Sequence, residues 1–283
     1  MQNLYVFSTG SESSLNQLSE AEKLSIYYHN LFDYPLNFSD LIKWSAGVHS
    51  GINNPAPIIN YKEGFYFLEG REGLIYKRVL RERTSRRKLK IAKRTGRILS
   101  LLPAVRMVAV TGSLAMNNSS DGSDIDLMIV TKKGNLWTTR LLVHLVLQAL
   151  LIPVRRAGRR DERDKLCLNM WLDEGDVVWR ERNLYTAHEI AQIVPLVNKE
   201  STYEKFLFKN RWIFKFWPNA VKIVNYKLKT ENSSRVLNIF ELTAYKLQCL
   251  YMKSKVTREV VTPTRALFHP QDWGKVVLSR LSS

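Results

Sequence analysis

Cysteine and long hydrophobic runs are scarce in this chain. Two of the 283 residues are cysteines, Cys167 and Cys249, and each lies within an apolar pattern. Neither has the spacing of a metal-ligand set, so we expect free, buried thiols of a reducing compartment. The longest apolar stretch, residues 141–154, is too short to cross a bilayer, and the first residues do not resemble a signal peptide. We therefore predict a cytoplasmic protein without a membrane span.

Several signatures of nucleotide binding and catalysis are also missing. The chain contains no P-loop, no dinucleotide-binding fingerprint and no legible serine–histidine–acid grouping. Four of its five histidines have no partners at metal-ligand spacing. The fifth, His188, is expected to be a core or helix-surface residue, with a position facing a nucleotide as the alternative.

Basic residues outnumber acidic residues in this chain, most strongly in two segments. Lysine and arginine number 43, against 26 aspartates and glutamates, and the sequence pI is about 9.9. Residues 77–97 hold eleven basic side chains and one acid, and residues 205–229 hold seven basic side chains, interleaved with aromatics, and no acid. Such clusters favour a polyanionic partner such as nucleic acid. The plainer alternatives are a solvated helix face for the first segment and core aromatics for the second.

The order of predicted elements divides the chain into four parts and indicates an α+β fold. Residues 1–70 contain two short helices and a hairpin, which is typical of a winged-helix-like module or of a helical cap docked on the next domain. Residues 71–102 are expected to form one basic helix. Residues 103–183 alternate strands with helices, which predicts a small mixed sheet. Residues 184–283 are predicted to form a helical C-terminal region.

Two carboxylates, Asp124 and Asp126, open a predicted strand at alternate positions. Side chains two residues apart in a strand point to the same side, so these carboxylates repel each other unless a cation lies between them. Oxygen ligands suit Mg²⁺ or Mn²⁺, which complete their coordination with substrate phosphates. Gly112 and Ser113 follow the preceding strand and offer bare backbone and a hydroxyl to phosphate oxygens. The two elements together predict a site for a metal-bound triphosphate.

The motif "GS", ten residues, then "DID" resembles the signature of the polymerase-β-type nucleotidyltransferase superfamily. The resemblance covers residues 105–131. It implies a small mixed sheet flanked by helices, Mg²⁺ or Mn²⁺ held by Asp124 and Asp126, and a nucleoside triphosphate such as ATP held by Gly112 and Ser113. The implied reaction is transfer of a nucleoside monophosphate to an acceptor hydroxyl, with release of pyrophosphate. The whole chain also resembles bacterial proteins that contain a nucleotidyltransferase domain, a likeness that names no acceptor.

The third carboxylate of that superfamily has no clear counterpart here. The strand expected to carry it, "DKLCLNMWLDEG", has no acid at its centre. Alternation along the strand predicts that Asn169 shares a face with Cys167, Trp171 and Asp173. Three alternatives remain open: Asp173 completes the site as a catalytic residue, Asn169 holds it with weaker metal binding, or activity is lost.

Three functions follow from these features. The first is a nucleotidyltransferase acting on an unknown acceptor hydroxyl, with nucleic acid or protein favoured. The alternative is a catalytically inactive protein of this fold that binds nucleic acid or has a regulatory role. A third is the nucleotidyltransferase half of a toxin–antitoxin pair.

Overall fold

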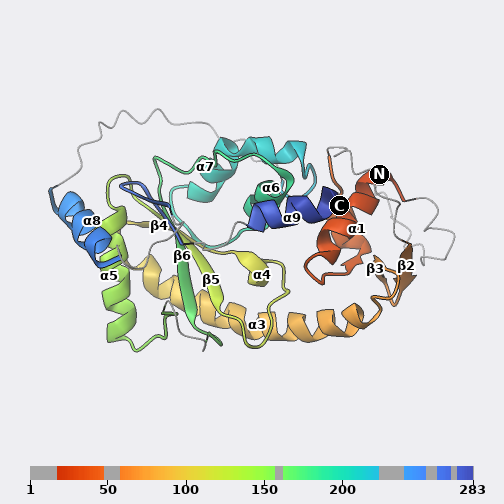
Figure 1. The fold of residues 1–283 in the computed structure, drawn as a ribbon. Coiled ribbons are helices and arrows are strands. Elements are labelled where there is room, and N and C mark those ends of the chain that lie inside the picture. Colours follow the sequence, from red (N-terminus) through yellow and green to blue (C-terminus); the bar gives the residue numbers. More distant parts are fainter. Residues whose placement is uncertain are drawn as a thin grey trace, which may run out of the picture.

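The structure is a computed structural model and describes residues 18–47, 58–156, 162–222, 239–252, 260–268 and 273–282. Helices and strands alternate along this part of the chain (Figure 1). The α-helices are α1 (Glu20–Asn30), α2 (Phe38–Lys43), α3 (Gly73–Ser100), α4 (Gly112–Ala115), α5 (Leu136–Ala149), α6 (Leu184–Ala191), α7 (Thr202–Lys209), α8 (Ile239–Met252) and α9 (Trp273–Ser282).

A mixed sheet forms the centre of the molecule. Its strands lie in the order β7 (Val194–Asn198), β4 (Val105–Val110), β5 (Ile125–Thr131), β6 (Leu166–Asp173), β9 (Arg265–Leu267), β8 (Val260–Thr262). β5 and β6 are parallel, and the other neighbouring strands are antiparallel. The predicted α+β class with a mixed sheet is therefore confirmed.

Alternating apolar side chains let the sheet bury both of its faces. Along β5, Ile125, Leu127 and Ile129 join a core beneath α3, α5 and α8. Met128 and Val130 point the other way, into a core shared with α1, α6, α7 and α9. In Figure 1, α5 and α8 lie on one side of the sheet, and α6, α7 and α9 lie on the other. Because side chains alternate along a strand, Asp126 lies on the same face as Met128 and Val130.

The N-terminal part contains the two predicted helices and the predicted hairpin. Ser19 and Glu22 cap α1 in the reciprocal manner that their spacing indicates. The hairpin of β2 (Ile59–Lys62) and β3 (Phe65–Leu68) joins the short strand β1 (Leu36–Asn37) in a three-stranded sheet. The winged-helix likeness itself stays a prediction.

The C-terminal part differs from the helical region expected. Residues 194–198, predicted to continue a helix, form edge strand β7, and β8 and β9 extend the other edge of the main sheet. Pro195 does not fit a helix interior, because it has no amide hydrogen to donate to the helix ladder. In the segment 205–229, which the structure describes as far as 222, Phe206, Trp212 and Trp217 are buried. These aromatics are core residues and do not offer faces for stacking on bases.

The basic helix α3 is present, but part of its charge is neutralised inside the protein. Arg78 is buried, donates to Asp40 and Glu82 at 2.8 and 2.9 Å, and also donates to a backbone carbonyl. Lys88 is fully buried and donates to the backbone carbonyls of Asp121 and Ser123. The inner face of α3 therefore holds the loop between α4 and β5 in place.

In the part of the chain that the structure describes, no helix is both long and apolar enough to cross a membrane.

We expect Lys88→Met to lower the free energy of unfolding by about 2–4 kcal/mol, because the carbonyls of Asp121 and Ser123 lose a buried charged donor. Lys90→Met is the matched control, since Lys90 is exposed on the opposite face of the same helix, and its effect should stay within about 0.5 kcal/mol. Denaturant unfolding measures both. Equal effects of the two substitutions would contradict a holding role for Lys88.

Candidate functional site

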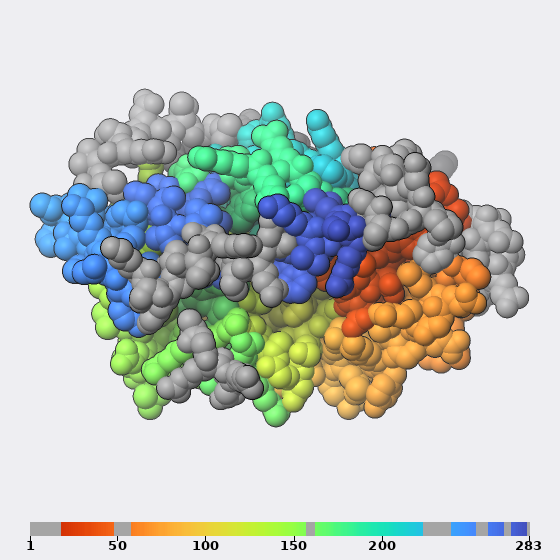
Figure 2. All heavy atoms as spheres, viewed as in Figure 1, coloured from red at the N-terminus to blue at the C-terminus, as the bar shows by residue number. Residues whose placement is uncertain are grey.

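A cavity of about 660 Å³ lies where β5, β6, α4, α6 and α1 meet. Its lining includes Asp124 and Asp126, as well as His29 and Phe32 of the N-terminal part. Trp273 of α9 also contributes to the lining. In the space-filling view, α9 (dark blue) lies at the surface beside the N-terminal helices (red) (Figure 2). The cavity is lined by parts of the chain that are far apart in sequence.

Strand register brings the predicted carboxylates and the glycine together. β4 and β5 are antiparallel, with Val110 opposite Leu127, and the Thr111 amide donates to the Asp126 carbonyl at 3.1 Å. Gly112, next along the chain, therefore lies beside the Asp126 side chain. Ser113 is exposed and lines the same cavity.

Gly112 is the residue that makes this approach possible. Its backbone has φ +59°, a left-handed conformation that side chains disfavour. A Cβ added here would lie 2.8 Å from Asp126 Oδ2, closer than real Cβ atoms come to oxygen. The position therefore requires glycine for two independent reasons, one in the backbone and one in the neighbouring carboxylate.

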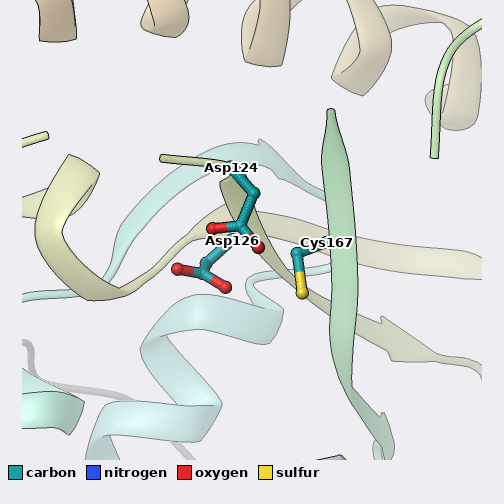
Figure 3. A group of neighbouring side chains, drawn as sticks. All are labelled: Asp124, Asp126 and Cys167. Atoms are coloured by element: carbon teal, nitrogen blue, oxygen red, sulfur yellow. The ribbon is translucent and has the colours of Figure 1, made fainter. Parts of the chain in front are cut away.

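The two carboxylates face the same space, as expected from their alternate positions (Figure 3). Burial raises the pKa of Asp126 to about 7, and the neighbouring Asp124 acts in the same direction. Asp124 Oδ2 accepts from Arg155 Nη1 at 2.8 Å. A protein cation thus balances Asp124, and none forms an ion pair with Asp126 among the described residues.

Arg155 was not singled out by the sequence, where it lies in a basic loop. A bridge between Val154 and Leu166 and a hydrogen bond from the Arg155 amide to the Leu166 carbonyl fix its backbone beside β6. Its side chain also reaches Glu162 at 2.5 Å and is partly exposed. The guanidinium therefore has a second carboxylate available at the rim of the site.

An irregularity in β6 decides which side chains reach the cavity. Asp126 pairs with Cys167 and Met128 pairs with Met170, so β6 has one more residue than β5 in this interval. Cys167 and Asn169 line the cavity, whereas Trp171 packs into the core on the opposite face. The prediction that Asn169 shares a face with Trp171 is wrong, because this bulge reverses the alternation.

Asn169 is 92% buried, since only 8% of its surface is exposed. Its amide nitrogen donates to Asp126 Oδ1 at 2.7 Å, which leaves Asn169 Oδ1 as the free end of the group. That oxygen is buried and has no hydrogen-bond partner among the described residues. An orphaned buried oxygen beside two carboxylates is suited to accept a cation or a donor from a ligand.

Asp173 does not join this group. It lies at the other end of the two parallel strands, paired with Thr131, whereas Asp126 pairs with Cys167. Its carboxylate is buried and accepts from the amides of Gly134 and Gly175 at 2.5 and 2.7 Å. The structure therefore corrects the expected role of Asp173: this side chain fixes the turn after β5, and Asn169 occupies the neighbourhood of the aspartates.

Glu189, on α6, is the acidic group that sequence reasoning missed. It lines the same cavity, and burial raises the pKa of its carboxyl to about 7, with the charge of Asp126 adding to the effect. Its carboxylate accepts from Gln192 at 2.6 Å and forms no ion pair among the described residues. The neighbouring His188 is buried, with Nε2 3.1 Å from His29 Nε2, which agrees with the expected core position.

Comparisons of the chain with models of protein families, with curated protein sequences and with solved structures find no match.

We expect Gly112→Ala to lower the free energy of unfolding more than Gly64→Ala does. Both positions have positive φ, which disfavours alanine by about 1–2 kcal/mol. Only at Gly112 does the added methyl meet a side chain, and such crowding adds about 1–3 kcal/mol. Denaturant unfolding of both variants measures the difference. Equal losses would mean that the Asp126 carboxylate moves aside without resistance.

Proposed function

We propose that this chain is a divalent-cation-dependent nucleotidyltransferase that moves a nucleoside monophosphate from a nucleoside triphosphate to an acceptor hydroxyl. The proposal rests on one observation: the Asp126 side chain lies against the backbone of Gly112, and both residues line the same cavity. The family resemblance depends on a glycine–serine pair followed by two alternate aspartates. Gly112 of the first element lies beside Asp126 of the second, which supports the proposal.

The residues at the site fit a divalent cation. Asp124 and Asp126 supply carboxylate oxygens, and Asn169 Oδ1 is a buried oxygen without a partner in the described structure. When bound there, such a cation supplies charge neutralisation for the phosphate oxygens and for the leaving pyrophosphate. The mutual repulsion of the carboxylates and the raised pKa of Asp126 both fall when a positive charge lies between them.

Each remaining group has a role that follows from its place. Gly112 lets a phosphate approach the backbone, and the exposed Ser113 hydroxyl can donate to a phosphate oxygen. The acceptor oxygen forms a bond to the α-phosphorus as the bond to the bridging oxygen breaks, and pyrophosphate leaves. Glu189 takes the acceptor's proton, because it is a carboxylate of the cavity that no cation of the described structure neutralises.

We expect Asp126→Asn to reduce nucleotide transfer by a factor of about 10² or more, because the variant loses a charged ligand of the cation that stabilises the transition state. Asp121→Asn is the matched control: Asp121 lies in the loop that precedes β5, is exposed, and pairs with Arg87 and Arg163 instead of facing the cavity. Incubation with labelled triphosphates and Mg²⁺ or Mn²⁺ measures label transfer and pyrophosphate release. Equal transfer by wild type and Asp126→Asn would refute the proposed site.

A second candidate function, binding of nucleic acid with or without turnover, is favoured by the outer face of α3. Six exposed basic residues recur there at helical spacing and have no acidic partner in the described structure. They are Arg83, Arg86, Lys90, Lys93, Arg94 and Arg97. At 1.5 Å per residue this basic stripe is about 20 Å long, a length over which several backbone phosphates can be contacted.

We expect the double variant Lys90→Glu/Arg94→Glu to weaken binding of a labelled single-stranded oligonucleotide and to reduce the slope of log affinity against log salt by about 2. Arg180→Glu/Arg182→Glu applies the same charge change to exposed residues outside the basic stripe and should leave the slope nearly unchanged. Fluorescence anisotropy over a series of salt concentrations checks both. Loss of affinity in both variants alike would indicate a response to net charge only.

A further inference from the structure

The donor set at the mouth of β5 and β6 contains a sulfur atom as well as oxygens. Ligand atoms of Asp124, Asp126 and Cys167 all lie within 4.8 Å of one another. Cys167 is the direct neighbour of Asp126 across the parallel strands, and Figure 3 shows its side chain beside the two carboxylates. One ion can therefore reach all three groups with small movements of their side chains.

The buried side chain of Asn169 gives independent support for a ligand beside Asp124, Asp126 and Cys167. Its side chain is more than nine-tenths buried, it lines the same cavity, and its Oδ1 has no partner in the described structure. Because its amide nitrogen donates to Asp126, the orientation of the amide is fixed by a neighbour that is itself a potential ligand. Two carboxylates, a thiol and an amide oxygen make four donors, the number that Zn²⁺ commonly takes in proteins.

Thiolate ligands change which cations a site prefers. Mg²⁺ takes oxygen ligands in an octahedral arrangement, whereas thiolate favours softer ions such as Zn²⁺ and Cd²⁺. Because cysteine binds a metal as the thiolate, a cation bound to the Cys167 sulfur replaces the thiol proton, which is released to solvent.

Arg155 contacts Asp124 and Cys167 and therefore competes with an ion for these two side chains. Its Nη1 lies 2.8 Å from Asp124 Oδ2 and 3.8 Å from Cys167 Sγ. Its other terminal nitrogen already contacts Glu162 at the partly exposed rim. Binding of an ion therefore requires the guanidinium to leave Asp124, and Glu162 is in position to keep it paired.

We propose that Cys167 is a ligand of this site, which takes a thiophilic divalent cation such as Zn²⁺ or Cd²⁺ together with Asp124, Asp126 and Asn169. The inference rests on the cation site of the proposed function, but not on the transfer reaction. Binding one ion forms a bond between the metal and the Cys167 sulfur and releases the thiol proton.

Titration of the full chain with Cd²⁺ tests the inference, followed by the ultraviolet charge-transfer absorption of the cadmium–thiolate bond and by calorimetry. Wild type should give the absorption with one ion bound. Cys167→Ser should abolish the absorption and weaken Cd²⁺ binding at least tenfold, while Mg²⁺ binding changes little. The matched control is Cys249→Ser, which removes the other free cysteine on α8 and should leave the absorption intact.

A measurement on the unaltered chain covers the case in which Cys167→Ser does not fold. Cd²⁺ should protect Cys167 from alkylation by iodoacetamide and leave the rate at Cys249 unchanged, as read by peptide mass spectrometry. Absorption that persists in Cys167→Ser, or equal protection of the two cysteines, would overturn the inference.

The same samples separate this inference from the proposed function. A cadmium–thiolate signal that depends on Cys167 and Asp126, without nucleotide transfer in Mg²⁺ or Mn²⁺, would support the metal site and refute the enzymatic proposal. Nucleotide transfer that depends on Asp126, without any cadmium–thiolate signal, would support the enzyme and refute the thiol ligand.

Discussion

Repulsion between two carboxylates on one side of β5 is the constraint around which this end of the molecule is organised. Asp124 and Asp126 face the same space because they occupy alternate positions of an extended segment. The two carboxylates have different partners in the protein. Arg155 balances Asp124 with an ion pair, whereas Asp126 accepts from neutral side chains, the Asn169 amide and the Cys167 thiol. No described cation pairs with the carboxylate that lies against Gly112, and burial beside Asp124 raises its pKa, so a cation in the cavity would stabilise its charged form.

Holding two like charges in place requires a rigid support, and the inner face of α3 supplies it. Lys88 fixes the carbonyls of the loop that enters β5, and Ser85 accepts from the Ser119 amide at 3.0 Å. Arg81 contributes from the same face by donating to Asn118 at 3.1 Å. The helix thus divides its basic residues between two tasks. Its inward residues hold the loop before β5 in place. The basic stripe on the opposite face has no acidic partner in the described structure. The two faces can therefore be altered independently.

Sequence patterns predicted those features that depend on local spacing. The alternation around Asp124, the capping of α1 and the length of α3 follow from residue order alone, and each is found in the structure. The predictions that failed depended on the register within β6 or on other contacts distant in sequence. The bulge in β6 reverses the alternation after Asn169, and no local signal in an apolar strand marks such an insertion. Arg155 and Glu189 are ordinary members of a basic loop and an amphipathic helix until the fold brings them to the cavity. Asp173 was favoured only because it was the nearest acid in the strand.

Asn169 and Cys167, both uncharged side chains beside Asp126, determine the charge of the site as well as its geometry. A third aspartate beside Asp126 would add a further negative charge to a place that is already short of cations. A neutral amide and a protonated thiol avoid that repulsion in the absence of an ion. With an ion bound, the thiol can lose its proton and supply the missing negative charge. The site can thus carry fewer charges when it holds no metal and recover them on binding.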